Sequence, residues 1–244
     1  MLLLVSSPAS AATAPTAGEV IARHVKAVGG KDAVLAVKGI KIEGEFSIPS
    51  VGWAVPMKVM LGNPDRNMTV ISAPGAGDIR SGYDGKVAWA MDPARGPQIL
   101  SGRRLVQARE DADLRRRFLV YQEKDVAKMT TAERTKFDGR DCDQVEVEWK
   151  SGTKETLYFD TGTGLLAGVK KQQETDDGAM EAAVTMTDYK KIGAVSFATK
   201  VALKIAQTEI LMNFQKVSME AVPATEFELP AAIKEKLQGQ PAAK

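Results

Sequence analysis

The chain has 244 residues, 44% of them hydrophobic, and its 33 basic and 31 acidic residues leave a formal net charge of +2. The two signs are interspersed, so the basic stripe that neutralises nucleic-acid phosphates is missing, and we expect no nucleic acid partner. The length suits a single β-rich domain. The lone cysteine, Cys142, excludes an intramolecular disulfide, so an apolar core must stabilise the fold.

The N-terminal segment is a short apolar run followed by small residues. Ala9-Ser10-Ala11 fits the small-x-small cleavage pattern of a secretory signal, although a positively charged first region is missing. We interpret residues 1–18 as a residual signal peptide, with a disordered, alanine-rich lead as the alternative. No later stretch approaches the roughly 20 apolar residues of a membrane span, so we expect an exported, soluble protein of the periplasm.

A helix is predicted from Glu19 to Val28, because its apolar residues have helical spacing and Gly29-Gly30 follows as a terminator. From Ile40 the period changes to two, and apolar side chains alternate with polar ones as far as Met91. An Asp-Gly hairpin turn at Tyr83–Lys86 interrupts this run, since glycine tolerates the positive φ of a tight reversal. The pattern predicts a meander of antiparallel strands.

Between Ser101 and Tyr121 the pattern becomes helical again, with one apolar stripe. Strands resume after it, separated by turns such as Asp138-Gly139 and Ser151-Gly152, and continue to Met219. The final segment, Pro223 to Lys244, predicts a short helix and a loose tail. We therefore divide the chain into a lead (1–18), a single domain (19–230) and a C-terminal tail (231–244).

This pattern predicts an α+β fold that is mainly β. We expect a strongly curved antiparallel sheet of about 10–12 strands that forms an incomplete barrel, covered by the N-terminal helix and by the mid-chain helix as a lid. Loosely packed helices would leave an apolar chamber, whereas tightly packed ones would give an ordinary core. Methionines and three tryptophans on the strand faces suit either outcome.

Few residues could support catalysis. His24 has no evident partner and is expected on a helix surface, and Cys142 has no activating histidine nearby and is expected to be a half-buried structural thiol. The acidic clusters at 110–113 and 176–178 lack the further ligands of a calcium loop and are expected to be solvated. We expect neither an enzyme nor a metal or other cofactor.

Six arginines make one edge of the mid-chain helix basic: Arg103, Arg104, Arg109, Arg115, Arg116 and Arg117. Such an edge could meet anionic head groups or a membrane surface. A solvated helix face is the favoured interpretation.

Four segments, 83–93, 137–142, 158–160 and 188–193, resemble in order and spacing those of the outer-membrane lipoprotein-sorting-like proteins, the superfamily of the periplasmic carriers LolA and LolB. The resemblance extends from Glu19 to Pro230. It implies an unclosed antiparallel barrel with helices over its mouth, an apolar cavity for acyl chains or other lipids, and transport or sensing without enzymatic turnover. The arginine that closes the lid of the lipoprotein carriers is not identified here.

We therefore predict a monomeric periplasmic carrier. Its expected partners are a lipid or lipidated protein, and a membrane surface or an envelope protein. The alternative is an envelope-sensing or protein-interaction module with the same fold. Opening is expected at Gly96-Pro97 and Gly102. The predicted cavity wall comprises Met57, Val59, Met68, Trp89, Met91, Trp149, Phe159 and Met186, and the predicted lid contacts are Leu105, Leu114 and Phe118.

Overall fold

The computed structural model describes residues 14–120, 123–131, 134–176 and 178–239. Residues 1–13 of the expected signal peptide and Tyr121 therefore lie outside the described residues. The α-helices are α1 (Ala17–Ala27), α2 (Lys31–Ala36), α3 (Gly102–Ala112), α4 (Leu114–Arg117) and α5 (Ala231–Gln238). The first half of the strands are β1 (Gly39–Ile48), β2 (Trp53–Gly62), β3 (Arg66–Ala73), β4 (Gly77–Tyr83), β5 (Ala88–Asp92), β6 (Gly96–Leu100) and β7 (Val126–Thr131). The others are β8 (Thr135–Phe137), β9 (Arg140–Trp149), β10 (Lys154–Asp160), β11 (Leu166–Thr175), β12 (Gly178–Ile192), β13 (Val195–Ile205) and β14 (Thr208–Ser218).

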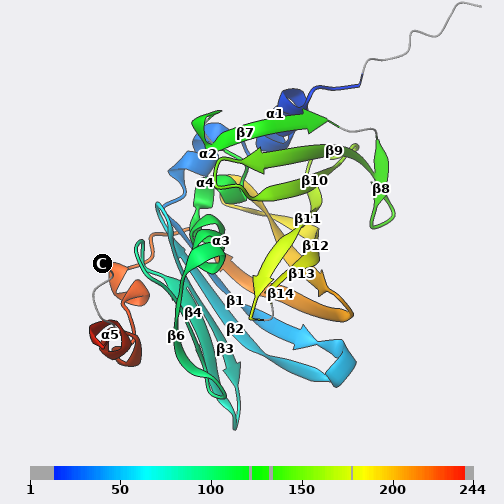
Figure 1. The fold of residues 1–244 in the computed structure, drawn as a ribbon. Coiled ribbons are helices and arrows are strands. Elements are labelled where there is room, and N and C mark those ends of the chain that lie inside the picture. Colours follow the sequence, from blue (N-terminus) through cyan, green and yellow to red (C-terminus); the bar gives the residue numbers. More distant parts are fainter. Residues whose placement is uncertain (1–13, 121–122, 132–133, 177, 240–244) are drawn as a thin grey trace, which may run out of the picture.

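The strands form one antiparallel sheet in the order β6-β5-β4-β3-β2-β1-β14-β13-β12-β11-β10-β9-β7, with β8 paired to β9. The two ends of this path are not joined, and the sheet curves so that its two halves face each other (Figure 1). The prediction of an open, curved antiparallel sheet with helices is confirmed. The described residues form fourteen strands, more than expected, because short strands such as β6 and β8 carry no clear alternation.

α3 and α4 lie across the concave side of the sheet, and together we call them the lid (Figure 1). They were predicted as one helix, but the backbone is extended at Asp113. The carboxylate of Asp113 accepts hydrogen bonds from the backbone N–H groups of Arg115 and Arg116, which caps α4 and separates it from α3. The lid is therefore two short helices.

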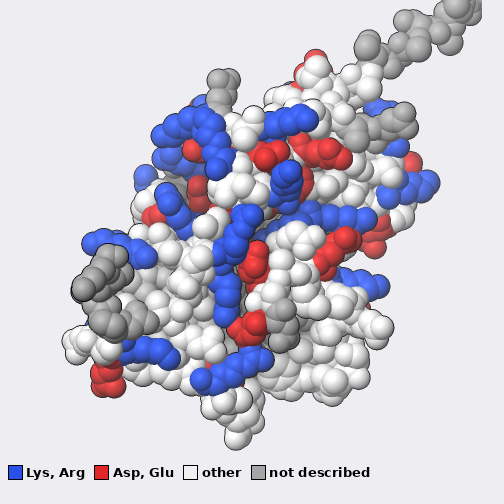
Figure 2. Space-filling view, in the orientation of Figure 1, with Lys and Arg blue, Asp and Glu red and all other residues white. Residues whose placement is uncertain are grey.

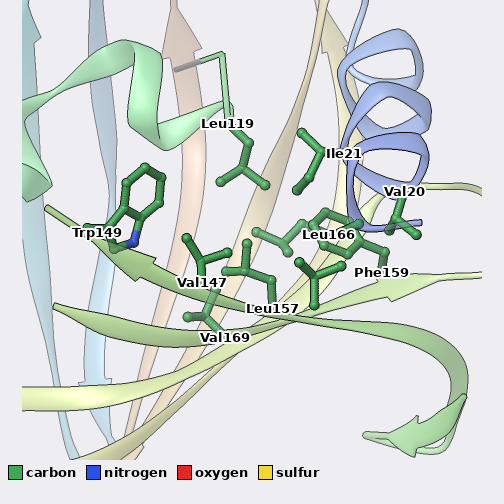
Figure 3. Close-up of a cluster of buried hydrophobic side chains, with 11 residues drawn as sticks. Val20, Ile21, Leu119, Val147, Trp149, Leu157, Phe159, Leu166 and Val169 are labelled. Carbon is green, nitrogen blue, oxygen red and sulfur yellow. The ribbon is translucent and has the colours of Figure 1, made fainter. Parts of the chain in front are cut away.

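Apolar side chains of α1 close one end of the curved sheet. Val20 and Ile21 pack into a buried cluster with Phe159 and Leu166 of β10 and β11, and Leu119 joins it from the segment after α4 (Figure 3). A Thr16–Glu19 capping box fixes the start of α1. No helix in the described parts of the chain is long and apolar enough to cross a membrane.

α5 packs on the opposite, outer face of the sheet (Figure 1). Ile233 is fully buried there with Phe227, Met68 and Trp89. α5 is the short helix expected between Pro223 and Lys244, but it falls within the segment 231–244 that was assigned to the tail, and it covers strands β3, β5 and β6. The even-numbered side chains of β3 consequently face α5 and not the concave side.

Replacing Ile233 with Ala should lower the free energy of unfolding by about 2–5 kcal/mol, because it removes a fully buried side chain and leaves a cavity under α5. Urea denaturation measures this change. Lys234→Ala, at an exposed position of the same helix, should stay within about 0.5 kcal/mol of the parent protein. Equal stabilities of the two variants would show that α5 does not contribute to the fold.

Candidate ligand-binding cavity

A cavity of about 560 Å³ lies between the concave face of the sheet and the lid. Small-molecule sites span roughly 300–1,000 Å³, so this one has the size of a binding site. Strands β2, β12, β13 and β14 supply an apolar wall. This wall includes Val59, Met186, Val201, Leu203, Met212 and Phe214.

All six of these side chains are only partly buried, although they lie on the inner face of the sheet. Their strands are aligned by regular pairing, which places Val201 beside both Met186 and Met212. In a close-packed core such residues would lose nearly all contact with water. Their exposure therefore indicates a cavity that the lid covers without filling.

The lid side of the cavity is charged. Arg116 pairs with Glu110 and, at 3.1 Å, with Glu155, and its guanidinium carbon lies 3.9 Å from the centre of the Trp149 ring. Trp149 donates its indole N–H to Glu155 at 2.8 Å. The side chains of Arg116 and Glu155 are 13% and 11% exposed, so each needs its partners to offset the cost of burial.

Lys171 on β11 forms a second link to the lid, through a 3.2 Å ion pair with Asp111. Burial by itself would lower the pKa of Lys171, but the carboxylates of Asp111 and Glu155 outweigh this effect and raise the pKa. The lysine therefore stays charged. Figure 2 shows basic and acidic side chains together over the middle of this face, where Figure 1 places α3.

These ion pairs correct two expectations from the sequence, one about the acidic residues of α3 and one about the arginines of the lid. The acidic residues Glu110 and Asp111 are not simply solvated, because they hold Arg116 and Lys171. Nor is the arginine edge a free basic face: Arg116 is largely buried, and Arg104 pairs with Asp176 at 2.5 Å.

His24 is buried, not on the helix surface as expected. Its Nδ1 donates to the carbonyl oxygen of Gly164 at 3.3 Å, and its ring centre lies 5.3 Å from that of Phe159. Burial lowers the pKa of His24 to about 4, and the Gly164 hydrogen bond offsets only part of this effect. The imidazole lines the cavity as a neutral group.

Cys142 is fully buried, and burial raises the pKa of its thiol, which is typical of a structural cysteine. Among the residues that the structure describes, no cluster of three or more His, Cys, Asp or Glu side chains could hold a metal ion.

Five of the eleven residues predicted for the wall and lid line the cavity: Met57, Val59, Trp89, Met186 and Phe118. Trp89 lies on the outer face of its strand. Its ring reaches the cavity beside Gly82, where a Cβ would lie only 3.0 Å from Trp89 Cζ2. Whether these residues contact a ligand stays a prediction.

The other six residues lie elsewhere. Met68 and Met91 face α5 on the outer side, and Trp149 and Phe159 belong to the buried cluster beneath α1. Leu105 packs with Tyr83 and Ala112, and Leu114 packs with Ile40 and Leu61. Sequence reasoning missed the wall of β13 and β14, although the alternation of Val201, Leu203, Met212 and Phe214 could have identified it.

The fold places the protein among the open, curved sheets of the LolA type. A LolA superfamily protein from Nitrosomonas europaea matches with a TM-score of 0.57 and 13% identity, over 88% of this chain and 99% of that chain. A domain named for outer-membrane lipoprotein sorting, from Vibrio parahaemolyticus, matches with a TM-score of 0.57 and 14% identity, over 86% and 94%. A DUF1329 family protein from Desulfovibrio piger matches with a TM-score of 0.57 and 14% identity, over 87% of this chain and 97% of that chain.

The family of the protein is identified from its amino-acid sequence. The model of a domain of unknown function, DUF4412, matches residues 106–233, just over half of the chain, and the protein belongs to this family. None of the curated proteins matches the sequence. The TM-scores and the coverage of the solved structures establish a shared fold, which confirms the expected resemblance to the LolA-like proteins.

The stability of the protein should fall by up to about 3 kcal/mol between pH 6.5 and pH 4 through His24 alone, because the pKa is about 4 in the folded state and 6.5 is its ordinary value. In this interval the unfolded chain takes up a proton that the folded protein excludes. His24→Gln should flatten the dependence, and no other histidine contributes. Urea unfolding at a series of pH values measures the difference. Parallel profiles for the two proteins would show that the folded state accepts the proton.

Proposed function

We propose that the protein binds a lipid or another long apolar molecule in this cavity and carries it through the periplasm without chemical turnover. The observation that supports this most strongly is the partial exposure of the apolar wall. A bound chain would remove this surface from water, and each Å² of buried apolar surface contributes about 25 cal/mol.

The architecture suits a ligand that enters and leaves the cavity reversibly. The lid is two short helices joined at Asp113, and its polar ties to β10 and β11 include ion pairs, which can break and re-form in water. Gly96 and Gly102, both with positive φ, flank the segment that leads into α3 and are our proposed hinge positions. Opening there would expose the wall of β13 and β14.

Export is part of the proposal and rests on the signal-peptide pattern at the N-terminus. Lipoprotein acyl chains are one candidate cargo, and a membrane or an envelope protein would be the donor or acceptor. Native mass spectrometry and lipid extraction of protein purified from its own host separate a carrier from an interaction module. Co-purified lipid supports the carrier, whereas a ligand-free protein in a stable complex with another protein supports the module.

Filling the cavity should weaken the binding of an apolar probe. Val201→Trp places an indole between Met186 and Met212, and we expect the affinity for N-phenylnaphthylamine to fall at least roughly tenfold, about 1.4 kcal/mol. Fluorescence titration with N-phenylnaphthylamine measures this affinity. Lys204→Trp, exposed on the other face of the same strand, is the matched control and should bind the probe as the parent does. Equal loss in both variants, or in neither, would contradict the proposed site.

A further inference from the structure

Arg117 differs from the other basic side chains around the cavity. Arg116 pairs with Glu110 and Glu155, Lys171 with Asp111, and Arg104 with Asp176. Arg117 also lines the cavity, yet among the described residues no carboxylate oxygen lies within 4.0 Å of its nitrogens. Its one described hydrogen bond runs from Nη2 to the carbonyl oxygen of Asp111, at 3.1 Å.

The surroundings of Arg117 place its guanidinium inside the cavity. Burial lowers the pKa of Arg117, and the charge of Asp111 only partly opposes this. The residue is nevertheless exposed to water. Because Arg117 lines the cavity and is also exposed to water, its guanidinium lies in a hydrated part of the cavity. Arginine keeps its proton there, so a cation without a paired carboxylate faces the cavity.

The apolar wall lies across the same cavity. Phe118, next to Arg117, packs with Ile40, Ile42 and Leu61 at one end of the wall. The wall continues along β2, where Val59 pairs with Ile42 and Met57 pairs with Gly44 of β1. A cation beside the start of an elongated apolar surface is complementary to a molecule with one charged end and one long apolar part.

We propose that Arg117 binds the anionic head group of a long-chain amphiphile, a carboxylate or a phosphate, whose chain lies along the wall of β2, β13 and β14. This inference rests on the proposed function and narrows it to acidic ligands. The guanidinium fork matches the geometry of both oxyanions, and charge-assisted hydrogen bonds are among the strongest available in a partly dehydrated site.

The carboxylates around the cavity are either paired with a cation, as Asp111 is with Lys171, or lie beside another part of the lid. Four carboxylates line the cavity, and three of them are paired with Arg116 or Lys171. For the fourth, Glu174, the described residues provide no cation within 4.0 Å. It lies beside Gln107, in the middle of α3, because its backbone N–H donates to Gln107 Oε1 at 2.8 Å. Arg117 belongs to α4 and its guanidinium bonds to the carbonyl oxygen of Asp111, at the end of α3, so Glu174 of β11 and Arg117 lie beside different parts of the lid.

Displacement of N-phenylnaphthylamine by three probes with the same chain tests the proposal: hexadecanoate, hexadecyl phosphate and hexadecanol. In the full-length protein, at least one of the two anions should bind roughly tenfold or more tightly than the alcohol. The tighter anion identifies the head group. Arg117→Gln should remove this preference and leave hexadecanol within about twofold of its original affinity.

Two further variants make the result specific. Arg115→Gln removes an exposed arginine from the same helix and should leave all three affinities unchanged, whereas Arg117→Lys keeps the charge and should keep part of the anion preference. If Arg117→Gln binds hexadecanoate and hexadecyl phosphate as the parent does, the anion site is wrong while the cavity function stands. If neither N-phenylnaphthylamine nor any of the three probes binds the parent protein, the proposed function fails and the anion site with it.

Discussion

The pairing of β1 with β14 is the constraint on which the rest of the structure depends. It joins the N-terminal meander, β1 to β6, to the strands that follow the lid, and so makes one continuous sheet. The two backbones approach closely at Gly44, where a Cβ would clash with the carbonyl oxygen of Asn213. Because twisted strands accumulate curvature, a sheet of this width must curl, and its two halves come to face each other.

A curled sheet with an apolar inner face has to be covered, and this chain provides little to cover it. α1 and α2 close one end, while the lid packs Leu105 and Leu114 at its edges and presents charged side chains, held by ion pairs, to the cavity. Charges held in this way resist deeper burial, since each would lose solvation without gaining a partner. The lid thus stays at the rim and leaves the wall of β13 and β14 partly open.

Local patterns predicted much of the fold. The Asp84-Gly85 and Asp138-Gly139 turns join β4 to β5 and β8 to β9, as expected from their positive-φ requirement. Alternation identifies residues that share a face of a strand, but it does not say which face is concave. Strand β3 is apolar on the face that α5 covers, so Met68 was assigned to the cavity side. The burial of His24 could not be foreseen either, because its neighbours are distant in sequence: Phe159 lies on β10 and Gly164 in the turn between β10 and β11.

The central claim is that apolar side chains of the inner face are held apart by the curvature of the sheet and enclose room for a chain. Methyl-labelled methionine NMR with bound hexadecanoate tests this directly. We expect nuclear Overhauser contacts from the chain methylene protons to the methyl groups of Met57, Met186 and Met212, and none to the exposed Met180. Contacts from these three methyl groups directly to side chains of the facing lid, with none to hexadecanoate, would show a filled interior and contradict the account.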